Sequence, residues 1–579
     1  MRPLGSFLVL AGALAGAVMA QPADAPLLPL DELKAGQAGE VWTVFQGATA
    51  EPFAVEVTGV VRNALGPGKS LIICQLTDPR VQNMGAVAGM SGSPLYIAGR
   101  LAGALSYQIQ RFETVRFAGF TPAADLEEVS ERATSQPPQL AATLQASSYK
   151  SLQPVFTFGG LSPAVADLFA PRLAALGLDA TALGGSTQSS GLIATHGPSA
   201  PPVTLRPGGA VAVALATGDI TLAGTGTVSR VDGTHVTAFG HPMMSLGDVA
   251  LPMCAAEIVT ILPSQMQSIK IANTGAVIGT ITQDRLSAVS GVLGDGPAMT
   301  AVDVTVNTHR GTPRHLRFSV ARQQQLTPVL VAAGVSQAIL GSNDAGLANG
   351  FRLTSDVRFP ADQKLAFQTL YSGPQGFAQG LNEFVQGLSA NLQNPYAKTF
   401  PDHVAFTVEP LEDNPAVTLD LFQLSRTTAR ARQTVQATIA WRDWQGDAHR
   451  EILDLPIDPA WTGKQLEVIL APGRTLDELT GRPRMISASE LRSFEAYLAA
   501  MRDDRQSDGV FIAVVEKTSL FSDQTVATPD APGSIERIAR ASDESRFRKR
   551  DALLPLWEKH LLEGKLLNTI IRRPLVVVD

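Results

Sequence analysis

Short apolar runs that alternate with polar positions dominate the start of the chain. After a leader over residues 21–36 with one short helical pattern, the runs VWTVF, FAVEVTGVV and LIICQL follow in close succession. The breaker ALGPGKS separates the second run from the third, and Ala98-Gly99-Arg100 separates LYI from LAGALSY, as hairpin turns do. The pattern predicts a first β-rich lobe over residues 21–121.

A second block of alternation follows a connector. Residues 122–206 are polar and rich in Pro, Ser and Gly, except for residues 162–178, where apolar positions recur about every 3.6 residues, as in a helix. The sequence GGAVAVALATGDITLAGTGTVSRVDGTHVTAF then alternates again. We therefore expect a second β-rich lobe over residues 207–322, joined to the first by the helical and loop connector.

The rest of the chain mixes both periodicities. Residues 323–400 contain two helical patterns and two strand patterns, which predict a mixed α/β segment. Residues 401–472 alternate regularly, which is typical of a small β-sandwich. Residues 473–579 are mixed, with a basic run at 546–550 on the solvated face of a terminal helix expected around 553–567. The predicted fold class is mainly β with α+β additions.

The first twenty residues have the organisation of a secretory signal peptide. One Arg precedes an apolar core from Leu4 to Val18, and small Ala20 precedes Gln21. No later apolar run reaches the roughly 18 uninterrupted residues that a membrane span needs. We therefore expect removal of residues 1–20 and an exported, soluble product that resides in the periplasm or outside the cell.

Composition excludes several classes of function. The net charge is −7 and the basic residues are scattered, so nucleic acid is not expected as a partner. The sequence has no CxxC, no HExxH and no paired-histidine spacing, so we expect neither a metal site nor a cofactor. The two cysteines, Cys74 and Cys254, lie in apolar strand-like contexts and are either two buried thiols or one disulfide of an export compartment.

One serine stands among small residues in the stretch AGMSGSP, residues 88–94. Its glycines allow unusual backbone conformations, so the amides of Gly89 and Ser91 can point into one pocket and form an oxyanion hole. The Ser91 hydroxyl would then be the nucleophile, which needs an adjacent base. The alternative interpretation is a Gly/Ser turn between strands.

His241 is the candidate base among the eight histidines of the chain. It follows an apolar strand through Gly240 and precedes Pro242 in the stretch AFGHPM, so it can be aimed from the rim of a β-barrel at another strand end. His235, six residues earlier, lies near a turn and is expected to be exposed. We expect the Ser91 hydroxyl and a His241 ring nitrogen at about hydrogen-bond distance, ~2.6–3.5 Å.

These two stretches resemble the SpoIVB-type serine peptidases, the stage IV sporulation protein B family. The resemblance is carried by LTDPRVQNMGAVAGMSGSPLYIAGRLAGALSY and by AFGHPM with the strands that follow it. It covers residues 42–121 and 207–320 and implies a trypsin-like double β-barrel that hydrolyses peptide bonds. The chain departs from the family in placing the serine block before the histidine block, in lacking a PDZ-like module ahead of the peptidase, and in its long C-terminal part over 323–579.

The sequence offers several carboxylates that could orient His241 and does not decide between them. The resemblance favours Asp78 in LTDPR. In a trypsin-like double barrel, however, the orienting Asp comes from the lobe that carries the histidine, which favours Asp248 or Asp284. A backbone carbonyl or a water molecule is the remaining alternative.

Two functions from different classes follow. The first is an exported serine endopeptidase that acts on polypeptides with Ser91, His241 and Asp78. The second is a catalytically silent, peptidase-like binding or scaffold protein that engages a protein partner through its C-terminal β-sandwich. An esterase would carry G-x-S-x-G in a strand-to-helix context, which the sequence lacks.

Overall fold

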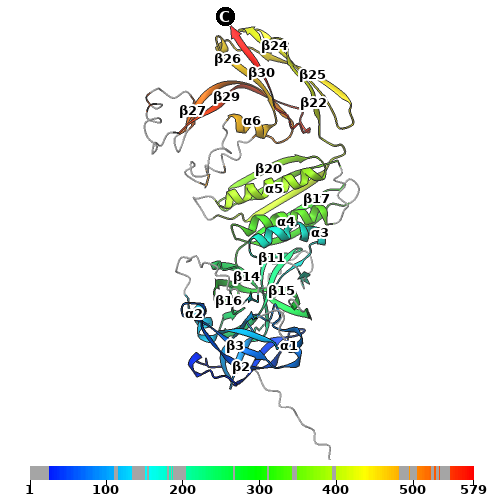
Figure 1. Cartoon of the computed structure of the whole chain (residues 1–579). Helices are drawn as coiled ribbons and strands as arrows, with labels where there is room; N and C mark the ends of the chain where they lie inside the picture. The colour runs from blue at the N-terminus through cyan, green and yellow to red at the C-terminus, as the bar shows by residue number, and fades with distance from the viewer. Residues whose placement is uncertain are drawn as a thin grey trace, which may run out of the picture.

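The computed structural model shows an elongated chain in which β-rich units follow one another from the N-terminal end to the C-terminus (Figure 1). The structure describes residues 25–109, 115–132, 150–152, 155–178, 182–183, 185–186, 204–264, 268–308, 312–341, 349–393, 399–480, 494–495, 498, 505–522, 527–529, 534, 537 and 548–579. The predicted signal peptide, residues 1–20, lies outside these described residues.

Six strands close into a first barrel. Its ring order is β4-β1-β2-β3-β6-β5, and the pairing of β5 with β4 closes it. The strands are β1 (Ala38–Val44), β2 (Ala50–Gly66), β3 (Lys69–Leu76), β4 (Pro94–Ile97), β5 (Arg100–Gln108) and β6 (Phe117–Pro122). The apolar positions that alternate in the sequence point inward, for example Phe53, Val55 and Val57 of β2. The two hairpins predicted at ALGPGKS and at Ala98-Gly99-Arg100 are confirmed.

A second barrel of six strands follows the connector. Its ring order is β11-β14-β15-β16-β13-β12, closed by the pairing of β12 with β11. The strands are β11 (Ala210–Gly218), β12 (Thr221–Asp232), β13 (His235–Ala238), β14 (Gly247–Leu262), β15 (Ile269–Arg285) and β16 (Ala288–Leu293). Together the two rings confirm the predicted double-barrel architecture, but the second ring ends with β16 at Leu293, short of the predicted boundary at residue 322.

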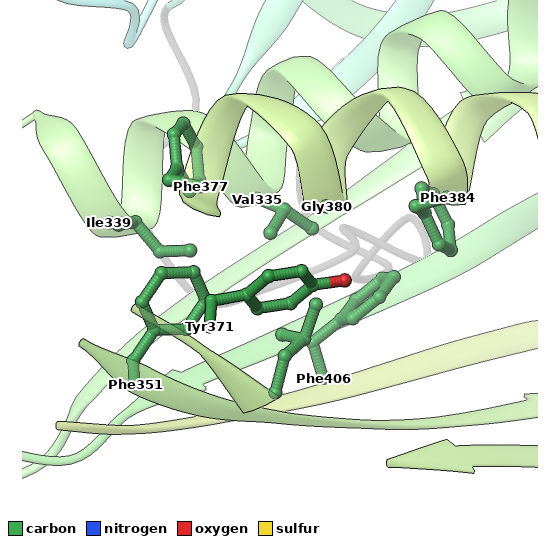
Figure 2. A pocket seen from close by; sticks show the side chains of 9 residues that line it. Val335, Ile339, Phe351, Tyr371, Phe377, Gly380, Phe384 and Phe406 are labelled. Atoms are coloured by element: carbon green, nitrogen blue, oxygen red, sulfur yellow. The ribbon is translucent and has the colours of Figure 1, made fainter. Parts of the chain in front are cut away.

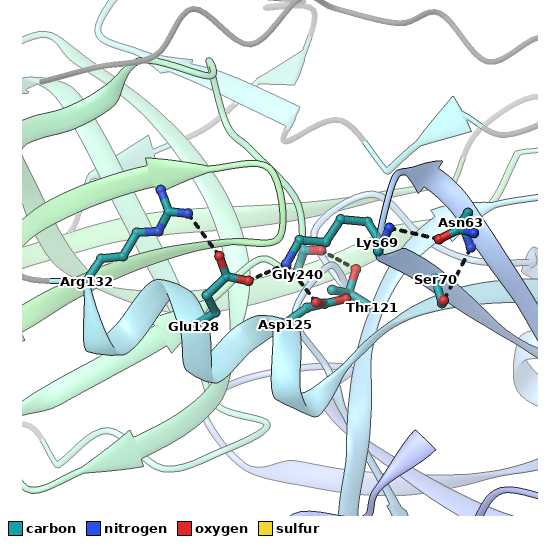
Figure 3. Close-up of polar contacts among 9 residues, drawn as sticks. Asn63, Lys69, Ser70, Thr121, Asp125, Glu128, Arg132 and Gly240 are labelled. Atoms are coloured by element: carbon teal, nitrogen blue, oxygen red, sulfur yellow. Dashed lines mark hydrogen bonds and ion pairs between the residues drawn. The ribbon is translucent and has the colours of Figure 1, made fainter. Parts of the chain in front are cut away.

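A short helix of the connector bridges the barrels. Leu126 and Val129 of α2 (Ala123–Glu131) pack with Ala104 of β5 and Ala288 of β16 in one apolar cluster. On its polar side, Lys69 of the first barrel pairs with Asp125 and Glu128 (Figure 3). The helix predicted at 162–178 is also present, as α3 (Pro163–Ala175).

The sheet of the second barrel continues into an α/β layer. Beyond β11, the path runs β18-β17-β21-β19-β20, and the predicted helices α4 (Leu326–Leu340) and α5 (Gly373–Leu392) pack on it. The five strands are β17 (Met299–Val306), β18 (Arg314–Ala321), β19 (Phe351–Arg358), β20 (Lys364–Tyr371) and β21 (His403–Pro410). Figure 2 shows the apolar pocket of this layer, whose lining includes Phe351, Tyr371 and Phe406. Its walls carry no charged side chain, so the candidate chemistry lies elsewhere.

Two sheets form the C-terminal β-sandwich, and they draw on more of the chain than the expected 401–472. One apolar cluster joins side chains from Val417 to Val577. The smaller sheet has the order β22-β24-β25 and the larger one β23-β30-β26-β27-β28, with β29 paired to β27. The strands are β22 (Thr418–Leu424), β23 (Thr428–Arg430), β24 (Thr434–Arg442), β25 (Ala448–Pro456), β26 (Gln465–Ala471), β27 (Val510–Ser522), β28 (Ala527–Pro529), β29 (Arg548–Leu561) and β30 (Ile571–Val578). The structure also places β21, inside the expected sandwich range, in the α/β layer instead.

The expected terminal helix at 553–567 is wrong, because residues 548–561 form strand β29. Pro555 explains the difference: inside a helix it would break a hydrogen bond and clash with the preceding turn. In the strand it lies where the register between β27 and β29 shifts, between Val514 and Val515, a position that tolerates proline. The basic residues of the run at 548–550 therefore begin a strand.

Cys74 and Cys254 are two free, buried thiols, one in each barrel. Burial raises the pKa of each thiol to about 12, so both are inert at neutral pH. In the described part of the chain, no helix is long and apolar enough to cross a membrane.

Candidate active site

The loop that carries Ser91 is tightly wound between α1 (Pro79–Met84) and β4. Met90 N–H donates to the Val87 carbonyl and Ser93 N–H to the Met90 carbonyl, at 2.9 and 3.0 Å. Gly89 and Gly92 both have φ +96°, a conformation that side chains rarely adopt. The AGMSGSP stretch is therefore a defined loop that presents Ser91 between two backbone reversals.

Gly92 brings this loop against the second barrel. A Cβ at this position would lie 2.0 Å from the Thr227 carbonyl oxygen and 2.4 Å from the Phe239 nitrogen, so only glycine fits. Thr227 also donates its N–H to the Ser91 carbonyl at 2.8 Å and its hydroxyl to the Gly89 carbonyl at 3.0 Å. The loop that carries Ser91, the candidate nucleophile, is thus part of the junction between the barrels.

The His241 segment meets the same junction from the other side. Phe239 and Gly240 have φ +69° and +67°, which turns the chain sharply after β13. The Gly240 carbonyl accepts a hydrogen bond from the Thr121 hydroxyl of the first barrel at 2.6 Å (Figure 3). A left-handed Phe costs about 1–3 kcal/mol, and such strain is concentrated at functional sites.

Ser91 and His241 are both completely buried, and both carry an atom without a partner. In the described residues, Ser91 Oγ and His241 Nε2 belong to the buried side-chain atoms that make no hydrogen bond. The hydrogen bond predicted between them is therefore not formed in this structure, as is frequent for catalytic pairs without substrate. Each unsatisfied buried polar group lowers the stability of the fold by about 1–3 kcal/mol. A purely structural turn gains nothing in return for this loss, so the two atoms favour a functional role.

The His241 ring is held in one tautomer by the backbone. Nδ1 lies 2.8 Å from the Pro242 carbonyl oxygen, and because a carbonyl only accepts, the proton is on Nδ1. Nε2 is then left as an acceptor. Burial lowers the pKa of His241 to about 4, although the Pro242 and Leu152 carbonyls both favour the protonated form. At neutral pH the ring is the uncharged imidazole that a general base requires.

The predicted oxyanion-hole donors are in keeping with the loop geometry. Among the described residues, the amides of Met90, Gly92 and Ser93 donate to backbone carbonyls, whereas those of Gly89 and Ser91 donate to none. Two amides that flank Met90 in this way can donate to a developing oxyanion.

The three candidate aspartates are each engaged away from the His241 ring. Asp78 caps α1 by accepting from Arg80 N–H at 2.8 Å and pairs with the Arg80 guanidinium, which lowers the pKa of this carboxyl. Asp248 accepts from Gln283 and Arg285. Asp284 is buried and accepts from the backbone N–H groups of Met243, Met244 and Leu246. It therefore fixes the loop that follows His241, while the orienting contact on the ring itself comes from the Pro242 carbonyl. A catalytic role for Asp78 stays a prediction.

Lys270 is a buried residue of this region that the sequence did not single out. Its stem lies against Gly89, where a Cβ would be 2.9 Å from Lys270 Cβ, and its Nζ donates to Thr43 Oγ1 at 2.8 Å. Burial lowers the pKa of this lysine to about 7. In the stretch SIKIAN, Ile269 and Ile271 are only half-buried, whereas Lys270 is buried.

Comparison with known proteins gives a family match in the region of the first barrel. A family model described as SpoIVB peptidase S55 matches residues 14–112, the part of the chain that contains the nucleophile loop. No curated protein and no solved structure matches the chain significantly. In the described residues, no group of three or more His, Cys, Asp or Glu side chains could hold a metal ion.

Proposed function

We propose that this chain, whose nucleophile-bearing region belongs to the SpoIVB peptidase S55 family, is an exported serine endopeptidase. The family supports hydrolysis of peptide bonds; the roles of individual residues are our inference. The observation that carries them is that two buried, partnerless atoms, Ser91 Oγ and His241 Nε2, belong to segments that pack at one inter-barrel junction.

In the proposed reaction, Ser91 Oγ attacks the carbonyl carbon of the scissile bond while His241 Nε2 takes its proton. The amides of Gly89 and Ser91 stabilise the tetrahedral oxyanion, at a value of about 3 kcal/mol for one donor. His241 then protonates the leaving amine, which departs and leaves an acyl ester on Ser91. Water, deprotonated by His241, hydrolyses this ester and restores the hydroxyl.

The silent scaffold remains the second candidate because Ser91 and His241 have no exposed surface in this structure. A peptidase must open this junction to substrate, whereas a binding protein would keep it shut. The appended β-sandwich would then engage the protein partner, and the peptidase-like barrels would only support it.

Labelling with a fluorophosphonate probe separates the two candidates. The purified chain without residues 1–20 is treated with the probe, and the modified residue is located by mass spectrometry. We expect modification of Ser91 and its loss in Ser91→Ala. Ser93→Ala is the matched control, because Ser93 is equally buried in the same loop but donates to the Met90 carbonyl at 2.6 Å. A chain that stays unlabelled while folded would support the silent scaffold.

A further inference from the structure

An extended piece of the connector lies beside the nucleophile loop. Strand β7 (Lys150–Ser151) pairs antiparallel with β5, with Ser151 opposite Tyr107 and Lys150 opposite Gln108. The next residue, Leu152, donates its N–H to the Ser106 carbonyl at 2.9 Å. Three consecutive residues thus follow the edge of β5 as an added strand.

Three different stretches of backbone pair in turn with this edge of β5. At Ala104 the partner is Pro94 of β4. At Leu105 it is the nucleophile loop, because Leu105 N–H donates to the Ser93 carbonyl and the Leu105 carbonyl accepts from Gly92 N–H. From Ser106 onward the partner is the connector segment. Along β5, the connector segment therefore pairs with the residues directly after the one that pairs with the Ser91 loop.

Leu152 is the residue of this segment that reaches the catalytic pair. Its backbone carbonyl lies near the His241 ring and favours the protonated form, although His241 Nε2 forms no hydrogen bond. Its side chain is 1% exposed and belongs to the apolar cluster that also contains Val87, Met90 and Leu105. A backbone paired along β5 and a side chain in the adjoining apolar cluster are what a bound substrate would supply on the acyl side of its cleaved bond.

We propose that the edge of β5 from Ser106 to Gln108 is the substrate-binding strand, and that the Leu152 side chain occupies the side-chain site of the residue on the acyl side of the cleaved bond. The substrate class is an extended peptide with a leucine-sized apolar residue at that position. This inference rests on the proposed function and names the substrate of the same site. Backbone pairing supplies affinity in such strand addition, and the side-chain pocket supplies specificity.

It follows that the segment 150–152 competes with any added substrate. While it is paired, Ser91 and His241 are covered, which explains why a candidate active site has no exposed surface. Substrate must displace the segment from β5, so weakening the hold of Leu152 lowers the KM for added peptide and leaves kcat unchanged.

The specificity test uses the parent protein and a series of internally quenched peptides. All contain Tyr-Lys-Ser-Xaa-Gln-Pro, after residues 149–154, with Leu, Phe, Ala, Lys or Asp at Xaa. We expect cleavage after Xaa and a kcat/KM for Leu that exceeds the value for Ala by at least about 1,000-fold, since Leu has three more carbon atoms and each methylene in an apolar pocket is worth roughly 10–200-fold. Cleavage that favours Lys or Asp, or that ignores Xaa, would overturn the inference.

The competition test compares Leu152→Ala with Leu76→Ala. Leu76 is equally buried in the same apolar cluster but lies on β3, so it serves as the control for lost packing. We expect KM to fall at least about tenfold in Leu152→Ala and to stay unchanged in Leu76→Ala. Equal KM values in both variants would overturn the competition, and the peptide series on the parent protein still decides specificity if Leu152→Ala does not fold.

Fluorophosphonate labelling distinguishes failure of this inference from failure of the proposed function. A parent protein that is labelled at Ser91 but cleaves no peptide of the series, or shows no preference for Leu, overturns only the substrate assignment. Absence of labelling together with absence of cleavage, in both the parent and Leu152→Ala, overturns the peptidase function itself.

Discussion

Replacing Lys270 with methionine tests whether the nucleophile loop rests on an uncharged lysine. Methionine keeps the unbranched stem that packs against Gly89 and removes the amine that donates to Thr43. In the folded state burial lowers the pKa of Lys270 from the ordinary 10.5 to about 7. The unfolded chain therefore binds more protons than the folded chain between these two pH values, and stability must rise with pH across that window.

The size of the effect follows from the same values. The folded state resists protonation of Lys270 by about 5 kcal/mol, because each pH unit of difference corresponds to about 1.4 kcal/mol. Nearly all of this cost is present at pH 7, and most of it has disappeared at pH 10. Relative to Lys270→Met, the parent should gain about 3 kcal/mol of unfolding free energy between pH 7 and pH 10.

The two buried thiols provide the assay. Pulsed alkylation in a urea series reports the unfolding of the first barrel at Cys74 and of the second at Cys254. Lys69→Met is the control, because Lys69 pairs with Asp125 and Glu128, and these partners raise its pKa. Parallel pH profiles for the parent and Lys270→Met would refute an uncharged lysine beneath the loop.

Three further predictions concern the catalytic junction. Because burial lowers the pKa of His241 from 6.5 to about 4, the parent should lose up to about 3 kcal/mol as pH falls through this window, and circular-dichroism melts should show no such loss in His241→Leu. Gly92→Ala should abolish labelling of Ser91 and destabilise the barrels by about 3 kcal/mol or more, since its Cβ would lie 2.0 Å from the Thr227 carbonyl oxygen; a folded, labelled variant contradicts the packed junction. Asp78→Asn should lose turnover by up to ~10⁴-fold if this carboxylate orients His241 as predicted, whereas turnover within about tenfold of the parent would leave Asp78 only as the cap of α1.

Much of the fold was predictable because its strands obey simple alternation. The strands of both barrels have one face inside and one outside. The alternation of apolar and polar residues in FAVEVTGVV therefore matches the alternation of buried and exposed positions. α4 and α5 were predictable from length and apolar spacing. The stretch RKRDALLPLWEKHL was not, because its charged ends suggested a helix face and only pairing with β27 makes it a strand.

The candidate site was predictable only where the backbone conformation requires a particular residue type, such as glycine. Ser91 and His241 stand out because glycines must flank a loop with positive φ and close approach. Lys270 and Leu152 leave no such trace, since their roles arise from contacts with Gly89 and Ser106, far from them in sequence. The orienting role of the Pro242 carbonyl could not be predicted from the sequence either, because every residue carries a carbonyl group.

The most direct test of the central claim is a double-variant cycle on Ser91 and His241. The value of kcat/KM for the Leu-containing peptide is measured for the parent, Ser91→Ala, His241→Ala and the double variant, with Ser93→Ala as the folded control. Because a nucleophile and its base act as one unit, each single variant should lose at least about 10⁴-fold and the double variant no more than either single one. Retained turnover in a single variant, or losses that add in the double variant, would contradict a Ser91–His241 pair.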